Sequence, residues 1–530
     1  MIKKEMVKVK FIASLCLFLG FLVGLNLIKG QNLVRSNSAT LYLAETKTIA
    51  DGVIDGYLGN RWDHSWQAKQ GFGGNDLAES EWGKSLFRKN RLKFYPSLEG
   101  VGSANGGDVQ RNGNVLNVAP VVTAVARYHL PPTGKYNILL WSRFEKHSVL
   151  SEENLDPFGH DFSSNQEPGR VSFHGSDSTW SEYDVGDGGI ILFYPEGEFT
   201  VGKSNPIWGP GYTGQLLFSK KAPSFTQISI RHKFSENWQF SSVHGWLNSN
   251  IDDSTYLDVY GPHGGLPLIR KYVAAHRMDV WIKKNFRIGF GESVIYGGRG
   301  VEPVYLIPFI FSWSSQHDLG DSDNLQMFFD FDWVMKRLGR FYGAFYLDEW
   351  DFVDTFSDSS RSWTAYQFGA AISLPIIQNW SPLLRVEYTR LSPYVYVHRS
   401  QVNSVEHHGH WLGYWSGPNS DNFFSAVEFM PRSDIWLQLY YQSSRRGEVT
   451  DETIDAQYDH QSVEFLYKTY EGEVETRTIM GLKAAAAVNS WLKLELELYS
   501  DDWLQRLDKS GVGRTSDQKM DAVVKLVIGL

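Results

Sequence analysis

Residues 491–499 read WLKLELELY, and their alternation decides the fold class of this chain. Successive side chains of an extended segment point to opposite faces, so one face carries four leucines and the other carries Lys493, Glu495 and Glu497. Residues 329–333, 384–388 and 524–530 alternate in the same way. This period predicts β-strands. The apolar face is the core in a soluble sandwich and faces lipid in a membrane barrel, so alternation alone leaves both architectures open.

The lengths of the connections favour the barrel. Short turns are predicted at 131–134, 235–237, 283–285, 336–340, 375–380, 431–434 and 488–490, and long connections at 151–189, 248–268, 391–422 and 501–518. Short turns at one end and long loops at the other are typical of outer-membrane barrels. One segment, 461–470, breaks this parity, and we assign it to a long external hairpin. The prediction is an all-β fold: a large antiparallel transmembrane β-barrel of about 18 strands, with long external loops and a short N-terminal segment outside the barrel.

Composition agrees with one large closed sheet. Hydrophobic residues make up 42% of the 530 residues and aromatic residues 15%, with 19 Trp and 26 Tyr. Such aromatics supply the interfacial girdles of a barrel or stack on sugars. A soluble array of β-sandwiches is the alternative, but it should show linkers between its domains. The formal charge of −9 gives no basic patch for nucleic acid, which excludes that class of partner.

The N-terminus has the layout of a secretory signal peptide. Lys3, Lys4, Lys8 and Lys10 precede an apolar run over 11–28, and an uncleaved membrane anchor is the alternative. The only cysteine, Cys16, lies in this segment, so the mature chain is expected to have no disulfide. We therefore divide the chain into a signal peptide (1–30), an N-terminal periplasmic or plugging segment (31–90) and an outer-membrane β-barrel (91–530).

Three segments between strands carry unusual residues. Residues 205–223 read NPIWGPGYTGQLLFSKKAP, in which prolines and glycines fix the backbone around two aromatics. Residues 407–421 read HHGHWLGYWSGPNSD, and residues 316–324 read QHDLGDSDN. With the turns placed as above, all three fall on the external side.

These segments resemble the Wzi family of outer-membrane capsule-assembly proteins. The resemblance rests on Trp208-Gly209-Pro210-Gly211 with the residues up to Pro223, on a frame from His410 to Asp421, and on the acidic turn at 316–324. Together these motifs extend from about Gly188 to Asp421. The resemblance implies a β-barrel lectin that holds capsular polysaccharide at the cell surface.

Each candidate residue has a binding interpretation and a packing interpretation. Aromatic rings can stack on the C–H faces of sugars, or they can fill the loops and lumen. The Gly-Pro context of Trp208 favours shaping of the loop, whereas Trp411 and Trp415 fit both interpretations. The glycan-binding or loop-shaping candidates are Trp208, Gly209, Pro210, Gly211, Tyr212, His410, Trp411, Tyr414, Trp415 and Asp421.

Metal and enzyme interpretations find little support. His408 and His410 have no third ligand at a fixed spacing, and Asp318, Asp321 and Asp323 lack the EF-hand pattern, so we expect no metal and no other cofactor. Wall charges such as Arg385/Glu387, Arg277/Asp279, Lys493/Glu495 and Asp330/Asp332 are expected to line the lumen. Neither a Gly-x-Ser-x-Gly elbow nor a Gly-rich phosphate loop occurs, so we expect no enzyme.

The sequence thus predicts a non-enzymatic barrel of the bacterial outer membrane. Its expected partners are capsular or other surface polysaccharide and outer-membrane lipid, and we expect a monomer. The alternative function is a general diffusion or saccharide-export porin.

Overall fold

The computed structural model describes the barrel wall and much of its interior. The described residues are 37–52, 60–63, 93–106, 115–130, 135–151, 174–176, 180–261, 265–349, 362–374, 380–448, 470, 472–489, 491–507 and 514–529. The proposed signal peptide and most of residues 461–470 lie outside them. In the described part of the chain, no helix is both long enough and apolar enough to span a bilayer.

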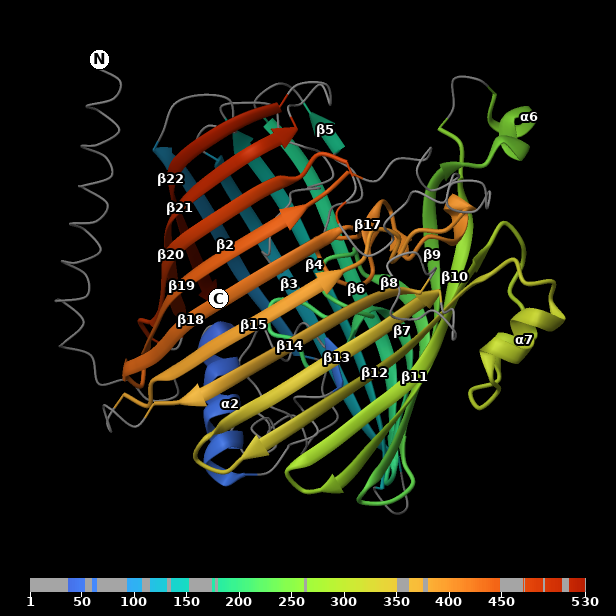
Figure 1. Ribbon diagram of the computed structural model, residues 1–530, viewed down its shortest axis with the longest axis horizontal. Helices are drawn as coiled ribbons and strands as arrows, with labels where there is room; N and C mark the ends of the chain where they lie inside the picture. The colour runs from blue at the N-terminus through green and yellow to red at the C-terminus, as the bar shows by residue number, and fades with distance from the viewer. Residues whose placement is uncertain are drawn as a thin grey trace.

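The described strands form one closed antiparallel β-barrel of 18 strands, as predicted (Figure 1). Nine belong to the N-terminal half: β2 (Lys93–Gly106), β3 (Val115–Leu130), β4 (Tyr136–Ser151), β6 (Trp180–Tyr194), β7 (Gly197–Trp208), β8 (Phe225–Lys233), β9 (Trp238–Asp252), β10 (Leu268–Lys283) and β11 (Phe286–Gly297). Nine follow: β12 (Asn324–Met335), β13 (Gly339–Glu349), β14 (Trp363–Ser373), β15 (Leu383–Leu391), β18 (Ser420–Arg432), β19 (Ile435–Arg446), β20 (Glu475–Ala487), β21 (Leu492–Leu507) and β22 (Arg514–Gly529). Each pairs with the next along the chain, and pairing of β22 with β2 closes the ring.

The predicted turns join strands at one end of the barrel. The connections β8–β9, β10–β11, β12–β13 and β18–β19 fall at the predicted positions. One short turn, residues 195–196 between β6 and β7, was missed because residues 151–189 were assigned to a loop. The Gly- and Asp-rich stretch before Gly189 belongs to β6, where close packing requires glycine: a Cβ on Gly189 would lie 2.8 Å from the Val201 carbonyl oxygen.

One other long connection is shorter than predicted. Strand β21 continues to Leu507 and β22 begins at Arg514, so only residues 508–513 connect them. The polar residues that suggested a loop remain in the sheet, where Asp501 accepts a hydrogen bond from Arg477 Nε at 2.8 Å. Strands β19 and β20 are direct neighbours. Residues 447–474 are therefore one connection at the long-loop end, the end to which segment 461–470 was assigned.

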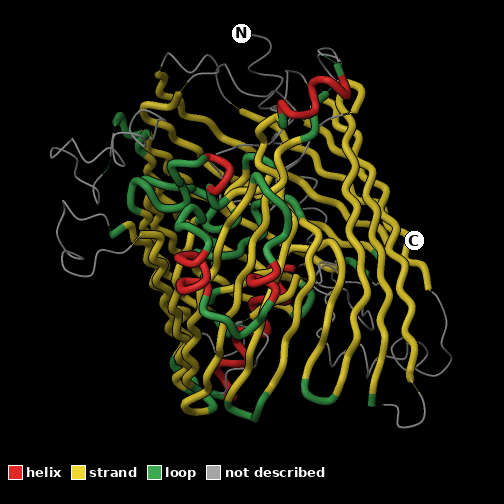
Figure 2. Tube along the Cα trace, turned by 90° about the vertical axis from the view of Figure 1, so that its right-hand side faces the viewer, coloured by secondary structure: helices red, strands yellow, loops and turns green. Residues whose placement is uncertain are grey.

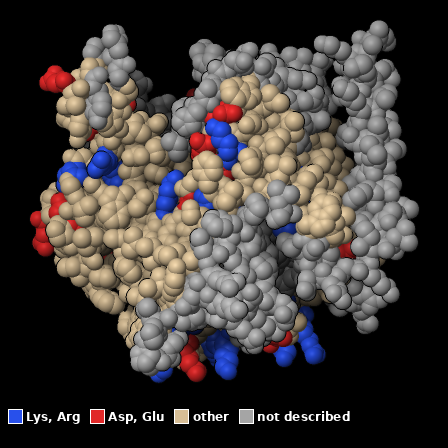
Figure 3. Space-filling model, turned by 180° about the vertical axis from the view of Figure 1, so that it is seen from behind, with Lys and Arg blue, Asp and Glu red and all other residues tan. Residues whose placement is uncertain are grey.

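The two faces of the wall differ as a membrane barrel requires. Large apolar side chains are exposed on the outer face, among them Phe290, Phe329, Trp333, Phe345, Phe368, Leu439 and Met480. Charged and polar side chains on the alternate positions point inward and are buried. Figure 3 shows uncharged side chains over much of the described wall, with Lys, Arg, Asp and Glu along its lower edge, where the short turns lie, and further charged side chains in its upper half. Lipid-facing positions are therefore apolar and lumen-facing positions are polar.

An N-terminal helix lies inside the barrel near the short-turn end (Figures 1 and 2). Helix α2 (Asn37–Asp51) packs Tyr42 and Ile49 among buried side chains of the inner wall. The Tyr42 hydroxyl donates to the Trp380 carbonyl oxygen at 3.3 Å, in the β14–β15 turn. A short strand, β1 (Asn60–Asp63), then pairs with the last four residues of β7, beyond the stretch of β7 that pairs with β6. These contacts support a plugging role for segment 31–90, which stays a prediction.

The long connections carry several short elements. These are β5 (His174–Ser176), η2 (Ser254–Tyr256), α6 (Leu257–Tyr260), η3 (Pro303–Leu306), α7 (Ser312–Asp318), η4 (Gln401–Asn403), β16 (Glu406–His407) and β17 (His410–Trp411). Strands β16 and β17 form a small separate sheet. Helix α7 lies outside the ring of strands, whereas η4, β16 and β17 lie across its upper end (Figure 1).

Candidate functional site

The connection between β7 and β8 folds into the barrel. We name residues 209–224 the inner loop. Its backbone is bound by side chains of the opposite wall: Arg340 Nη2 on β13 donates to the Pro210 carbonyl oxygen at 3.2 Å, and Gln367 Nε2 on β14 donates to the Gly214 carbonyl oxygen at 3.0 Å. A Cβ on Gly211 would lie 2.2 Å from Gln367 Oε1. The glycine therefore allows the loop to approach the wall closely.

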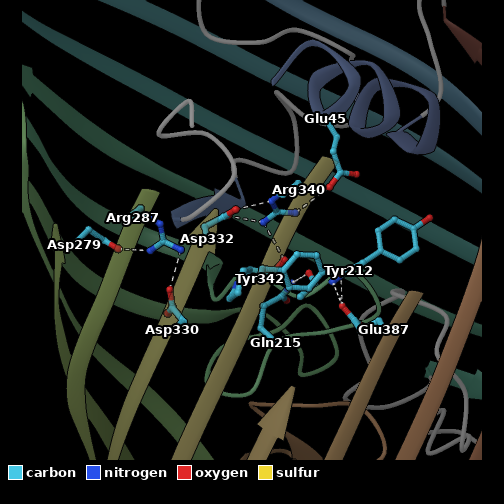
Figure 4. Close-up of polar contacts among 12 residues, drawn as sticks. Glu45, Tyr212, Gln215, Asp279, Arg287, Asp330, Asp332, Arg340, Tyr342 and Glu387 are labelled. Carbon is cyan, nitrogen blue, oxygen red and sulfur yellow. Dashed lines mark hydrogen bonds and ion pairs between the residues drawn. The ribbon is translucent and has the colours of Figure 1, made fainter. Parts of the chain in front are cut away.

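Glu387 is the main anchor of the inner loop (Figure 4). This carboxylate on β15 accepts hydrogen bonds from the backbone N–H groups of Tyr212 at 2.6 Å and Thr213 at 2.9 Å. The Tyr342 hydroxyl on β13 donates to it at 2.7 Å. Hydrogen bonds to an ionised acceptor are stronger than neutral ones, so a single wall residue fixes the tip of the loop.

Tyr212 extends from this tip into a charged part of the lumen. Its ring centroid lies 3.8 Å from Arg385 Cζ, and its hydroxyl donates to Glu428 Oε1 at 2.9 Å. Burial, together with the Glu428 charge, raises the pKa of Tyr212. The hydroxyl therefore remains protonated and continues to donate. The sequence left this ring as a candidate for binding glycan or for shaping the loop, and in the structure it packs against the inner wall.

The connection between β15 and β18 covers the inner loop. We name residues 392–419 the mouth loop. The Ser219 N–H donates to the Leu412 carbonyl oxygen at 2.8 Å, and the hydroxyls of Thr213 and Tyr414 lie 2.6 Å apart. The Tyr396 hydroxyl donates to the Leu216 carbonyl oxygen. Two of the segments that the sequence singled out therefore form one folded unit.

The third segment joins the same unit. Asn403 Nδ2 on the mouth loop donates to the Ser322 carbonyl oxygen at 2.9 Å, and Asn324 Nδ2 donates to the Asn403 carbonyl oxygen at 3.0 Å. Asp323 is held by Arg299, whose Nη2 lies 2.7 Å from Asp323 Oδ2. Among the described residues, no group of three His, Cys, Asp or Glu side chains is arranged to hold a metal ion. All three segments come together at the long-loop end.

Most candidate residues are buried. Trp208, Pro210, Gly211, His410, Tyr414, Trp415 and Asp421 are buried, whereas Gly209, Tyr212 and Trp411 are partly exposed. Trp208 packs edge-on against Phe218 with ring centroids 5.3 Å apart. Asp421 pairs with Arg445 on the neighbouring strand, with Oδ2 and Nη2 2.5 Å apart. Of the three candidate tryptophans, Trp411 is the most exposed, and it packs against the buried cluster that contains the other two.

A chain of buried ion pairs runs around the inner wall from β10 to β18. Arg287 Nη2 lies 2.8 Å from Asp330 Oδ1, and Arg340 Nη2 lies 2.6 Å from Asp332 Oδ2. Figure 4 shows Arg340 and Asp332 beside Glu45 of helix α2, with Arg287 and Asp330 on the strands to one side. Among the side chains expected to line the lumen, Arg277 pairs with Asp279, whose Nη2 and Oδ1 lie 2.5 Å apart. Arg385 binds Glu428, at 3.2 Å, while Glu387 binds the inner loop.

Glu45 on α2 links this chain to the N-terminal helix, and it was not among the candidates. Its carboxylate lies 3.0 Å from Arg340 Nη1 and 2.5 Å from Arg385 Nη2. Burial alone would raise the pKa of Glu45, but the charges of Arg385 and Arg340 outweigh burial and lower it to about 2. The available signal was the helical spacing of Tyr42, Glu45 and Ile49 on one face. Arg340 thus holds both α2 and the inner loop.

Three histidines of the mouth loop are held neutral. Burial lowers the pKa of His398 and of His408 to about 4, with the positive charge of Lys203 also acting on His408. Burial and the neighbouring His408 lower the pKa of His407 well below its usual range. His407 Nδ1 accepts from the Asn248 N–H at 3.0 Å, which fastens the mouth loop to β9.

Comparisons with known proteins identify relatives of this barrel. A family model described as capsule assembly protein Wzi matches residues 191–515. A search of curated proteins found no match. The solved structure of Wzi from Escherichia coli, described as a carbohydrate-binding β-barrel involved in group 1 capsule assembly, is similar at 13% identity and a TM-score of 0.51, covering 94% of this chain and 98% of that one.

Two further solved structures have lower TM-scores. OccAB4 from Acinetobacter baumannii has 7% identity and a TM-score of 0.44, covering 84% of this chain and 99% of that one. OprD from Pseudomonas aeruginosa has 9% identity and a TM-score of 0.43, covering 83% and 95%.

Proposed function

The chain belongs to the capsule assembly protein Wzi family and lies in the bacterial outer membrane, and from this we propose that it binds capsular or other surface polysaccharide and helps to anchor or organise it. The proposed role is that of a lectin without enzymatic activity. The observation that carries the proposal is the folded unit at the long-loop end. Three loops interlock there through backbone and side-chain hydrogen bonds and present a fixed surface to the outside.

The contacts inside the barrel favour polysaccharide binding over diffusion of solutes through the lumen. The alternative function, a diffusion or export porin, needs a water-filled path along the inner wall. Instead, Arg340, Gln367 and Glu387 are engaged by the inner loop, and Arg385 is engaged by helix α2. Charged groups that would line a channel instead bind the inner loop and helix α2, which we together name the plug.

The proposed contact surface is the accessible part of the mouth loop. Arg399, Ser400 and Gln401 are exposed, and the Trp411 ring is partly exposed within the same loop. Sugars present C–H faces to aromatic rings while polar neighbours bind their hydroxyl groups. The buried rings of Tyr414 and Trp415 would support this surface from below without touching the glycan.

Replacing Trp411 tests the proposal. In a pull-down of purified barrel with capsular polysaccharide, we expect Trp411→Ala to retain about tenfold less glycan, equivalent to about 1.4 kcal/mol of lost contact. Trp313→Ala, which removes an exposed tryptophan on helix α7 outside the barrel, is the matched control and should bind normally. Heat-modifiable gel mobility shows whether each variant folds. Failure of the unaltered protein to retain any capsular or surface glycan would refute the proposal.

A further inference from the structure

The connection between β11 and β12 lies against the outside of the barrel. We name residues 298–323 the outer flap. Its helix α7 lies beyond the wall in Figure 1 and in front of it in Figure 2, which views the molecule from that side. The Phe309 ring stacks on Phe240 of β9 with centroids 4.5 Å apart, and lies 6.2 Å from the ring of Phe234 in the short β8–β9 turn. The flap therefore descends along the wall toward the short-turn end.

The lowest part of the flap is apolar and uncharged. Residues 306–313 read LIPFIFSW, and the sequence has no charged residue between 303 and 316. The charges of the flap lie at its two ends, as in Arg299, Glu302 and Asp318. Five side chains of this stretch are exposed: Leu306, Ile307, Phe309, Phe311 and Trp313. In water such a patch would be costly, because soluble surfaces rarely expose contiguous apolar side chains of this size.

The underside of the flap is polar and explains a charged group on the outer wall. Glu292 of β11 points outward, where a carboxylate in contact with lipid would be costly. The flap buries it. Its Oε2 accepts from the Trp313 N–H at 3.3 Å, its Oε1 accepts from the Ser312 N–H, and His276 Nε2 lies 3.1 Å from Oε1. Glu292 therefore binds the start of α7 and is shielded by it.

The backbone of the flap is hydrogen-bonded within the protein. Besides the two N–H groups bound by Glu292, the Ile307 N–H donates to the Val304 carbonyl oxygen at 3.2 Å, and the Ile310 N–H donates to the Ile307 carbonyl oxygen at 3.3 Å. The bilayer core holds no water to bond backbone N–H and C=O groups, so these groups must be satisfied within the protein. The flap meets this requirement along much of residues 306–313.

We propose that residues 306–313 are inserted in the bilayer beside the wall, with the acyl chains of membrane lipid as the occupant of their apolar face. Continuity with the membrane-facing wall identifies this occupant. Phe290 of β11 and Phe329 of β12 are exposed on the same outer wall as the flap's apolar side chains. The flap adds a second layer to one sector of the wall. It covers the outward-facing Glu292, which would otherwise contact lipid.

Site-specific fluorescence quenching tests the insertion. Cys16→Ser removes the only cysteine, after which Phe311→Cys carries a single environment-sensitive probe. Val259→Cys on α6 is the matched control, because Val259 is 71% exposed and Phe311 75%. In phosphatidylcholine vesicles, the probe at 311 should be quenched by lipid brominated on its acyl chains and protected from aqueous iodide. The probe at 259 should show the opposite pattern.

Two outcomes would overturn the proposal. Quenching of the 311 probe by iodide to the same extent as the 259 probe would place the flap in water. Disulfide-linked dimers of unlabelled Phe311→Cys would show that a second copy covers this face. Heat-modifiable mobility confirms folding of each variant, and Leu306→Cys provides a second labelling position if Phe311→Cys does not fold. None of these measurements depends on polysaccharide binding, so they stand apart from the proposed function.

Discussion

At the scale of single residues, Glu45 shows how one buried carboxylate can organise a barrel interior. It lies between Arg340 and Arg385, two guanidinium groups from different strands. A buried charge is tolerated only when it is paired. Removing Glu45 would leave both arginines with one fewer partner and would release the helix that carries it.

We expect Glu45→Ala to weaken docking of helix α2 by about 3–5 kcal/mol, the usual effect of removing one partner from a buried ion pair. Hydrogen exchange of the α2 amides measures this docking directly. Lys47→Ala changes an exposed residue of the same helix and should leave exchange unchanged. Equal protection of α2 in the Glu45→Ala and Lys47→Ala variants would contradict this role.

The lowered pKa of Glu45 predicts that docking of helix α2 weakens in acid. The pKa of Glu45 is about 2 in the folded protein and 4.5 ordinarily. At pH values between these two, the folded state therefore binds fewer protons than the unfolded state. Its contribution is fully present above pH 4.5 and is lost as the pH falls toward 2. Protection of α2 should therefore decline over this range in the unaltered protein, while Glu45→Gln should show a low protection that changes little with pH.

At the scale of elements, the mouth loop is held by neutral histidines. His398, His407 and His408 all have lowered pKa values because they are buried. An undocked loop would take up protons below about pH 6.5, the ordinary pKa of histidine, whereas the docked loop would not. Docking is therefore strongest above pH 6.5 and weakens as the pH falls toward 4.

We expect limited proteolysis within residues 392–419 to be faster at pH 5 than at pH 7.5. His408→Asn keeps a polar side chain beside Asn248 but cannot be protonated, so it should reduce the difference between the two pH values. Cleavage at an exposed site near α6 provides the control for protease activity. A cleavage rate in the mouth loop that does not change with pH, after this correction, would contradict the histidine mechanism.

At the scale of the whole molecule, the inward-facing charges of the wall bind the plug. We expect the unaltered barrel to show little conductance in planar bilayers and a Gly-Ser replacement of residues 209–222 to conduct several-fold more. Replacing residues 254–260, which lie in another long connection, should change little. A wide-channel conductance in the unaltered protein would instead favour the porin alternative.

The sequence predicted the wall better than the interior. Strict alternation, as at residues 491–499, is a local signal, and it identified the class and the strand number. Strand ends that continue beyond the apolar band, as around Asp501, carry no such signal and were read as loops. Gly-rich β6 was missed in part because its glycines serve close packing rather than a turn.

The candidate site was predicted in its segments but not in its contacts. Trp208, Tyr212 and Tyr414 were identified because they stand among prolines and glycines. The wall partners of Tyr212, Glu387 and Glu428, come from strands more than 150 residues away in sequence. No local pattern records such pairings, so the sequence could not separate rings that bind the wall from a ring, such as Trp411, that remains partly exposed.

The position of α2 also constrains the order of assembly. Closure of the ring requires β22 to meet β2, which lies more than 400 residues earlier in the chain. Until then both strands have open edges, and pairings of such large sequence separation form slowly. Helix α2 precedes β2 and lies within the finished ring, so the simplest order has the wall forming around it. The salt-bridged helix would then serve as a template during insertion, and Glu45 variants should slow barrel closure as well as loosen the finished plug.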